Sequence, residues 1–353
     1  MVIDLDKIEH NARTIVNLAD KIGIEITGVT KATCGDFKVA RAILAGGAVS
    51  IADSRIENIQ NLEKSGVKTD FMLLRTPMLS EIKSVVEHVD VSLNSELEVI
   101  SRLSDEAMKK NNTHQIVLMV EMGDLREGVN RNKVADAIEE ILGFDGVELY
   151  GIGMNLACFG GVVPTDEKIN KFDKLVNDIE NKFKISFKMV SGGNSANIPL
   201  LFKNPRKSRI SNLRIGEGIL LGLETVNRTP IPNTYQDAFV LESEIIELKE
   251  KPSLPDGEIS QNAFGETPVF EDRGIITRGI VAIGKQDVIV KDLTPIDPNI
   301  SILGSSSDHI LLHIKNPKYV VGDVVQFSMK YGALVHLFTS KYVKKVYVGR
   351  SFS

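Results

Sequence analysis

The feature that most constrains the fold is a regular alternation of short apolar runs with amphipathic segments over roughly the first 220 residues. Eight runs have the length and composition of buried strands: 26–30, 49–52, 71–74, 89–93, 116–120, 149–154, 187–190 and 213–215. Helical periodicity lies between them, at 37–45, 55–65, 79–88, 95–110, 132–142, 166–183 and 195–203. This count predicts an α/β fold, a closed parallel (β/α)8 barrel of the TIM type. An open doubly wound sheet is the alternative, but it usually carries a glycine-rich turn after its first strand, which Thr30-Lys31-Ala32-Thr33 is not.

The pattern changes beyond about residue 225, where helical periodicity fades and proline and glycine separate β-rich runs. The runs are 238–248, 275–283, 287–290, 300–303, 310–314, 324–327 and 341–348. We therefore expect a barrel domain over residues 1–225 and a C-terminal all-β domain over residues 226–353.

Composition sets broad limits on function. A net charge of -5 argues against a nucleic-acid partner, which would need a clustered basic face. The two cysteines, Cys34 and Cys158, allow no disulfide framework and no paired-cysteine metal spacing. The sequence has no apolar leader and no apolar run of spanning length, so we expect a cytoplasmic protein without membrane or metal partners.

Candidate chemistry lies at the carboxyl ends of the predicted barrel strands, where enzymes of this fold place their reactive groups. Lys31 follows the first strand, although a surface lysine is the alternative interpretation. Glycine-rich turns follow strands seven and eight, at residues 191–195 and 214–218. Backbone N–H groups at such turns bind phosphate. A phosphate site together with a strand-end lysine suggests pyridoxal phosphate attached to Lys31 as a Schiff base, or alternatively a sugar-phosphate aldolase.

Four motifs resemble the fold-type III pyridoxal-phosphate enzymes, which comprise the alanine racemase family and its decarboxylase relatives. They are Val29-Thr30-Lys31-Ala32, Glu121-Met122-Gly123 followed by Arg126-Glu127-Gly128, Asn194-Ser195-Ala196, and Arg214-Ile215-Gly216. The resemblance implies a homodimer with shared active sites and a pyridoxal 5'-phosphate cofactor on Lys31. It further implies that Arg126 binds the substrate carboxylate. The residues that it places around the cofactor are Asn155, Asn194, Ser195, Arg214, Gly216 and Glu217.

Arg214 distinguishes two reactions of this family, unless it is only a structural arginine at a strand end. The decarboxylases carry glutamate at this position, which keeps the pyridine nitrogen protonated. A guanidinium keeps its own proton, so the nitrogen stays unprotonated and the carbanion is less delocalised. We therefore expect reprotonation at Cα, and hence racemisation.

Three positions differ from alanine racemase itself. Met119 occupies the position of a supporting lysine of that enzyme. Phe264 occupies the position of the tyrosine that acts as the second acid/base, and Lys341 occupies the position of a tyrosine that contacts phosphate. The segment Gly304-Ser305-Ser306-Ser307-Asp308-His309 instead resembles the decarboxylases' Gly-x-x-Cys-Asp. This resemblance implies that Asp308 binds a distal substrate amine and that Ser307 donates a proton, both in the partner's active site. A solvated serine-rich loop is the alternative.

Further segments are similar to the ornithine racemase branch of the family: 52–58, 155–165, 271–274 and 331–334. We therefore predict an amino-acid racemase acting on a basic amino acid, with ornithine as the first choice. A racemase for lysine, alanine or a broad range of amino acids, a diamino-acid decarboxylase, and a non-catalytic cofactor carrier remain alternatives. The carrier is disfavoured because such proteins lack the second domain.

Overall fold

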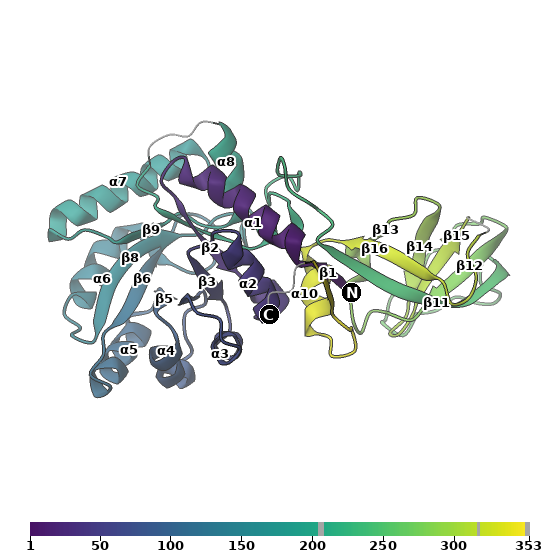
Figure 1. The fold of residues 1–353 in the computed structure, drawn as a ribbon, viewed down its shortest axis with the longest axis horizontal. Coiled ribbons are helices and arrows are strands. Elements are labelled where there is room, and N and C mark those ends of the chain that lie inside the picture. The colour runs from purple at the N-terminus through teal and green to yellow at the C-terminus, as the bar shows by residue number, and fades with distance from the viewer. Residues whose placement is uncertain (204–207, 316–317, 350–353) are drawn as a thin grey trace. The chain divides into compact units, whose positions relative to one another are not determined.

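A computed structural model describes residues 1–203, 208–315 and 318–349 (Figure 1). The chain divides into two compact units. The barrel unit spans Leu5–Gln236 and includes Gly349, and the β unit comprises Met1–Asp4 and Asp237–Val348. The boundary predicted at residue 225 lies inside the barrel unit, because Asn11 exchanges hydrogen bonds of 2.8 and 2.7 Å with the backbone of Tyr235 and so holds the later residues to the barrel.

The barrel unit contains a closed ring of parallel strands. Its strands are β2 (Glu25–Val29), β3 (Ser50–Asp53), β4 (Asp70–Leu73), β5 (Val91–Asn94), β6 (His114–Glu121), β8 (Val147–Met154), β9 (Met189–Ser191) and β10 (Asn212–Ile215). They pair in the order β5-β4-β3-β2-β10-β9-β8-β6, and β5 also pairs with β6, which closes the ring. The short β7 (Val129–Asn130) pairs with β6 alone. The closed barrel is therefore confirmed, and the open sheet is excluded.

Helices lie outside these strands (Figure 1). They are α1 (Leu5–Asp20), α2 (Phe37–Ala45), α3 (Ile56–Lys64), α4 (Ile82–His88), α5 (Leu97–Lys109), α6 (Val134–Ile141), α7 (Asp166–Phe183), α8 (Ile198–Lys203) and α9 (Glu217–Leu221). The start of α2 shows how sequence sets a boundary, because the Asp36 side chain accepts hydrogen bonds of 3.0 Å from the N–H groups of Lys38 and Val39. Short 3-10 turns follow β2 (η1, Lys31–Thr33) and β9 (η4, Ser195–Asn197).

The barrel interior has an apolar part and a polar part. The apolar cluster comes from strands β2 to β6: Val29, Ala52, Met72, Val91, Leu93, Val117 and Met119. Buried polar side chains come mainly from β2, β3, β9 and β10: Thr27, Ser50, Ser191, Asn212 and Arg214. Because buried polar groups need hydrogen-bond partners, the polar part constrains the geometry at β9 and β10 more tightly than apolar packing would.

The β unit confirms the predicted C-terminal β domain. Its strands are β1 (Val2–Asp4), β11 (Phe239–Pro252), β12 (Ile275–Val281), β13 (Leu293–Pro295), β14 (Ile300–Ser305), β15 (Ile310–Ile314), β16 (Val324–Met329) and β17 (Val346–Val348). The path β13-β16-β11-β12-β15-β14 is antiparallel, whereas β1 pairs with β17 in parallel.

Two predictions for this domain were wrong in detail. Residues 287–290 form no strand, since a 3-10 turn at Val290–Asp292 leads into β13. The domain also contains a helix, α10 (Tyr331–Thr339), which the sequence patterns did not predict. Its buried residues Ala333, Leu334, Leu337 and Phe338 follow helical spacing, so packing supports a helix despite the β-prone composition. In the described part of the chain, none of the helices combines the length and hydropathy needed to cross a membrane.

Candidate active site

Lys31 lies in η1, directly after β2, at the carboxyl end of the barrel. Its position is fixed through the preceding residue, because the Thr30 hydroxyl donates a 2.8 Å hydrogen bond to the buried Asp53 carboxylate. Asp53 also accepts hydrogen bonds from the Asn58 side chain at 2.9 Å and the Arg55 N–H at 3.1 Å. Burial raises the pKa of Asp53, while these donors oppose the rise by stabilising the charged form.

The surroundings of Lys31 destabilise the charged form of its amine. Desolvation lowers the pKa of Lys31 below its usual value, and the positive charges of Arg126 and Arg214 lower it further. Asp53 and Cys158 act in the opposite direction. A lysine with a lowered pKa has more of the free amine that forms a Schiff base with a carbonyl compound. Lys31 therefore has the chemistry that its position suggests.

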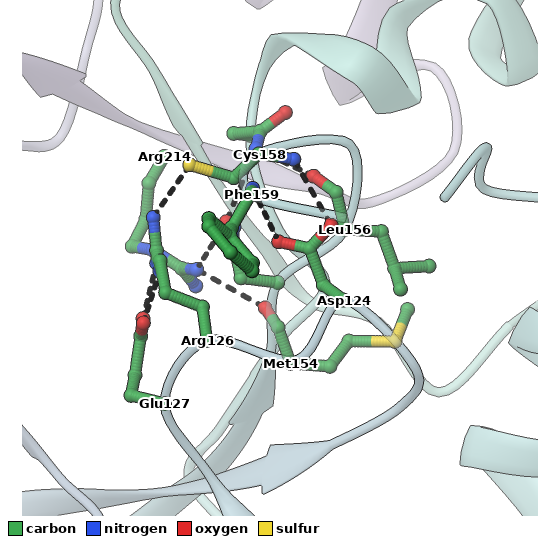
Figure 2. A network of polar contacts seen from close by, with 10 residues as sticks. Asp124, Arg126, Glu127, Met154, Leu156, Cys158, Phe159 and Arg214 are labelled. Atoms are coloured by element: carbon green, nitrogen blue, oxygen red, sulfur yellow. Dashed lines mark hydrogen bonds and ion pairs between the residues drawn. The ribbon is translucent and has the colours of Figure 1, made fainter. Parts of the chain in front are cut away.

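Two loops at this end of the barrel are joined through Asp124 (Figure 2). The Asp124 carboxylate accepts hydrogen bonds of 3.1 Å from the N–H groups of Cys158 and Phe159. Arg126 makes an ion pair with Glu127 and donates a 2.7 Å hydrogen bond to the Cys158 sulfur. The loops after β6 and β8 thus hold a guanidinium close enough to influence both Lys31 and Arg214.

Arg214 is a buried cation on β10. Its guanidinium donates to the Ser191 hydroxyl, to the Met154 carbonyl at 3.1 Å and, more weakly, to the Asn155 side-chain oxygen at 3.5 Å (Figure 2 shows the Met154 bond). Desolvation lowers the pKa of Arg214 to about 10, so the group stays protonated at neutral pH. All these partners are neutral acceptors.

The turns after β9 and β10 are connected to each other. The Asn194 side chain accepts from the Ala196 N–H at 2.8 Å and donates to the Leu156 carbonyl at 2.8 Å and to Asn155 at 3.1 Å. The Ser195 hydroxyl accepts a 3.1 Å hydrogen bond from the N–H of Gly218. The structure therefore brings together the residues that the sequence singled out at these two turns.

Two further positions at these turns have a clear physical role. A Cβ at Gly216 would lie 3.2 Å from the Cβ of Val29, so a side chain there would need a small local shift of the end of β2. Glu217 is buried and makes an ion pair with Arg228, which the sequence analysis did not single out. These contacts fix the backbone of the β10 turn.

The arrangement fits a phosphorylated aldehyde cofactor. It offers the Lys31 amine, the buried Arg214 cation and two interlocked glycine-rich turns. Within the described residues, the buried side-chain nitrogen of Asn155 has no hydrogen-bond partner, and such a donor is costly unless a ligand satisfies it. Asp53 and Cys158 also belong to this region. The sequence analysis assigned neither a role here, although the segments 52–58 and 155–165 contain them.

Comparison with known proteins agrees with this geometry. The family model described as "Alanine racemase, N-terminal domain" matches residues 3–223. The chain belongs to the alanine racemase family. This family uses pyridoxal phosphate.

Relatives of the alanine racemase family match this chain over almost its whole length. Ornithine racemase of Acetoanaerobium sticklandii is 41% identical and lysine racemase of Thermotoga maritima 39% identical, each over 98% of both chains. The solved alanine racemase of Streptomyces coelicolor A3(2) has a TM-score of 0.79 at 15% identity, covering 99% of this chain and 97% of that one. The protein is therefore an amino-acid racemase, and identities near 40% do not separate ornithine from lysine as its substrate.

The positions that differ from alanine racemase have distinct surroundings. Met119 is buried in the apolar cluster of the barrel, and its sulfur would lie 2.9 Å from a Cβ at Gly153. Phe264 is an exposed residue of the β unit, with the Lys285 ammonium 4.2 Å from its ring centroid. Lys341 is an exposed residue of the same unit. A phenyl ring cannot transfer a proton, so Phe264 cannot act as an acid or base.

Ser307 and Asp308 lie on the exposed turn between β14 and β15 of the β unit. The Ser307 hydroxyl donates a 2.9 Å hydrogen bond to the Asp308 carboxylate. The structure describes this turn within its own unit, so the roles of both residues at an active site stay predictions. In the described parts of the chain, no group of His, Cys, Asp and Glu side chains is arranged to hold a metal ion.

Proposed function

We propose that the chain is a pyridoxal-phosphate-dependent racemase of a basic amino acid, most readily ornithine, and that it acts as a homodimer. The observation that carries this proposal is that Lys31 and Arg214 lie at the same end of the barrel, where the charge of Arg214 acts on Lys31. Lys31 is an amine with a lowered pKa, and Arg214 is a buried guanidinium that donates hydrogen bonds to neutral acceptors. The full-length relatives named ornithine racemase and lysine racemase support a diamino acid.

The cofactor would be held by residues from four strand ends. Lys31 would bond its aldehyde, the turns at Asn194-Ser195 and Gly216-Glu217 would receive its phosphate through backbone N–H groups, and Arg214 would donate to its ring nitrogen. The unpartnered Asn155 nitrogen supplies a further donor. When bound, pyridoxal phosphate withdraws electrons from Cα and so makes the Cα proton of an amino acid acidic.

Lys31 serves as the proton carrier on one face of the substrate. Desolvation lowers its pKa and so favours the free amine, which would take the Cα proton and return one. Arg126 offers its guanidinium to the substrate α-carboxylate, in exchange for part of its present pairing with Glu127 and Cys158.

The opposite face is assigned to the β unit of the partner subunit. Asp308 would bind the distal ammonium of the substrate, and Ser307 would donate the proton. The hydrogen bond from Ser307 to Asp308 stabilises the hydroxyl form of the serine, so Ser307 transfers a proton only in concert with Asp308.

Arg214 favours racemisation over decarboxylation in this proposal. Because its guanidinium donates hydrogen bonds and accepts none, it cannot supply a proton to the ring nitrogen without leaving a buried neutral arginine. With Arg214 at its ring nitrogen, bound pyridoxal phosphate would be a weaker electron sink, which would favour reprotonation at Cα over loss of carbon dioxide.

The test is incubation of the cofactor-loaded protein with L-ornithine and, separately, L-lysine in D2O. Chiral chromatography measures the D-enantiomer, mass spectrometry measures deuterium at Cα, and a gas assay measures carbon dioxide. We expect D-ornithine with Cα deuterium and a higher kcat/KM for ornithine than for lysine. Carbon dioxide release with net loss of the L-amino acid would identify a decarboxylase. Faster turnover of lysine would make the lysine racemase assignment the correct one.

A further inference from the structure

A continuous row of buried polar side chains crosses the barrel interior from Arg214 to β3. Arg214 donates to the Ser191 hydroxyl, which donates to the Asn212 side-chain oxygen at 3.0 Å. The Asn212 amide nitrogen donates to the Thr27 hydroxyl at 2.9 Å, and the Thr27 and Ser50 hydroxyls lie 2.9 Å apart. We call Ser191, Asn212, Thr27 and Ser50 the polar chain. None of its members has a role in the proposed chemistry.

Strand register brings these residues together. The pairing of β10 with β2 sets Arg214 opposite Thr27, and the pairing of β10 with β9 sets Asn212 opposite Ser191. All members are buried: Thr27 and Ser191 have no exposed surface, Asn212 has 1% and Ser50 has 9%. Buried hydroxyl and amide groups are costly unless paired, so the chain must be satisfied internally.

The hydrogen bonds nearest Arg214 in the polar chain run in one direction. A guanidinium has donors and no acceptor, so the Ser191 oxygen must accept from it and its proton must point onward to Asn212. Asn212 then accepts with its oxygen and donates with its nitrogen to Thr27. In the contact between Thr27 and Ser50, either hydroxyl can be the donor. Ser191 and Asn212 therefore turn the oxygen ends of their dipoles toward the cation.

The aligned dipoles explain how a desolvated cation is retained without a carboxylate among its hydrogen-bond partners. Burial disfavours the charged form of Arg214, and aligned hydrogen-bond dipoles compensate because their negative ends face the charge. The charged groups that act on Arg214 are Glu127, which stabilises its charge, and Arg126, which opposes it, while Lys31 is affected by it. None of these three belongs to the polar chain.

We propose that Ser191, Asn212 and Thr27 are positioning residues for Arg214, which hold its guanidinium charged and oriented so that a donor remains for the neutral ring nitrogen of the cofactor. This inference rests on the proposed function, because it assigns the chain's effect to bound pyridoxal phosphate. A carboxylate in the same place would neutralise the guanidinium and occupy its donors. The polar chain provides compensation without that competition.

A second polar cluster in the same barrel provides a matched control. The Ser92 hydroxyl lies 2.8 Å from the His114 ring nitrogen and accepts a 2.9 Å hydrogen bond from Asn94. Ser92 is fully buried like Thr27, but its hydrogen bonds do not lead to Arg214. Loss of either hydroxyl leaves buried partners unsatisfied and lowers stability to a similar extent. Only loss of Thr27 interrupts the polar chain.

The test compares Asn212→Asp, Thr27→Val and Ser92→Ala with the wild-type protein. Three quantities are measured: the melting temperature, the dissociation constant of pyridoxal phosphate, and the midpoint pH of the absorption change of the bound cofactor. We expect Asn212→Asp to raise the midpoint by about half a pH unit or more, because a carboxylate near Arg214 offsets its positive charge. We expect Thr27→Val to weaken cofactor binding about threefold or more, because the amide of Asn212 loses its acceptor. Ser92→Ala should change the melting temperature alone.

The inference is overturned if both chain variants bind the cofactor with the dissociation constant and midpoint of Ser92→Ala. Thr27→Val keeps the side-chain shape. If Asn212→Asp does not fold, the dissociation constant of Thr27→Val alone tests the positioning role of the polar chain. Suppose that the wild-type protein binds pyridoxal phosphate and racemises ornithine, and that both chain variants have the dissociation constant and midpoint of Ser92→Ala. This result would remove the inference and leave the proposed function intact. A wild-type protein that binds no cofactor would remove both.

Discussion

The Thr30 hydroxyl donates a 2.8 Å hydrogen bond to the Asp53 carboxylate, and this contact connects the residue before Lys31 to the end of the next barrel strand. Asp53 is buried and accepts hydrogen bonds from two other groups, so it is itself well fixed. The backbone that carries the Lys31 side chain is therefore held in a fixed position. The same carboxylate also raises the pKa of Lys31, against the stronger effect of desolvation.

Replacement of Asp53 by Asn should lower the pKa of Lys31. The amide keeps an oxygen for Asn58 and Arg55, but the negative charge that favours the lysine ammonium is lost. The pH dependence of the rate at which cofactor-free protein combines with pyridoxal phosphate should move to lower pH, by less than about one unit. Glu224→Gln, which alters another buried carboxylate, is the control. An unchanged profile in a folded Asp53→Asn protein would contradict the electrostatic role.

Replacement of Gly28 by Ala should destabilise the barrel by about 1–3 kcal/mol, because the new methyl group meets a packed helix. A Cβ at Gly28 would lie 2.2 Å from the Ile43 side chain of α2. Gly304→Ala is the control, since a Cβ at Gly304 would meet no heavy atom within 4 Å. Urea unfolding of both variants measures the difference. Equal stability of the two would show that α2 moves away at little cost.

Stability should fall in mild acid because of His114. Burial lowers the pKa of His114 from 6.5 to about 4, so the folded state binds this proton less readily than the unfolded state. The stabilisation is complete above pH 6.5 and is lost as the pH falls toward about 4. At pH 5 the loss from this residue is about 2 kcal/mol. Urea unfolding at pH 7.5 and pH 5 gives the difference in the free energy of unfolding between the two pH values. This difference should be smaller for His114→Gln than for the wild type. An identical difference in the two proteins would rule the histidine out as the cause.

Replacement of Asp308 by Asn should reduce kcat/KM for ornithine by about tenfold to a hundredfold, the effect of losing one charge-assisted contact to the distal ammonium. The reduction should appear mainly in KM, because the contact is made in the ground state as well. Asp256→Asn, an exposed carboxylate in a loop of the same unit, is the control. Full activity of Asp308→Asn on ornithine would remove the assigned role.

Much of the barrel was predictable because buried parallel strands leave a strong local pattern. The run at 71–74 became β4 at Asp70–Leu73, and the segments at 37–45 and 166–183 became α2 and α7 with the predicted bounds. The capping residues Asp36 and Thr165 lie immediately before those helices, and the side chain of each accepts a hydrogen bond from a first-turn N–H. The strand-end residues Lys31, Asn194 and Arg214 followed from these elements.

Other features depend on contacts that local patterns do not contain. The bond from Asn212 to Thr27 joins residues 185 positions apart, and only closure of the barrel brings them together. The contact between Arg126 and Cys158 links two loops whose conformations are set by Asp124. Helix α10 was missed because its Tyr, Val, Phe and Thr residues have high strand propensity, which packing within the β unit overrides.

The most direct measurement of the central claim is reduction of the cofactor-loaded protein with borohydride, followed by proteolysis and mass spectrometry. Reduction makes the bond between a lysine and pyridoxal phosphate permanent. We predict a single modified peptide that carries the cofactor on Lys31, and we predict that Lys31→Ala neither retains the cofactor nor racemises ornithine. Modification of a different lysine, or cofactor-dependent racemisation by Lys31→Ala, would contradict the account.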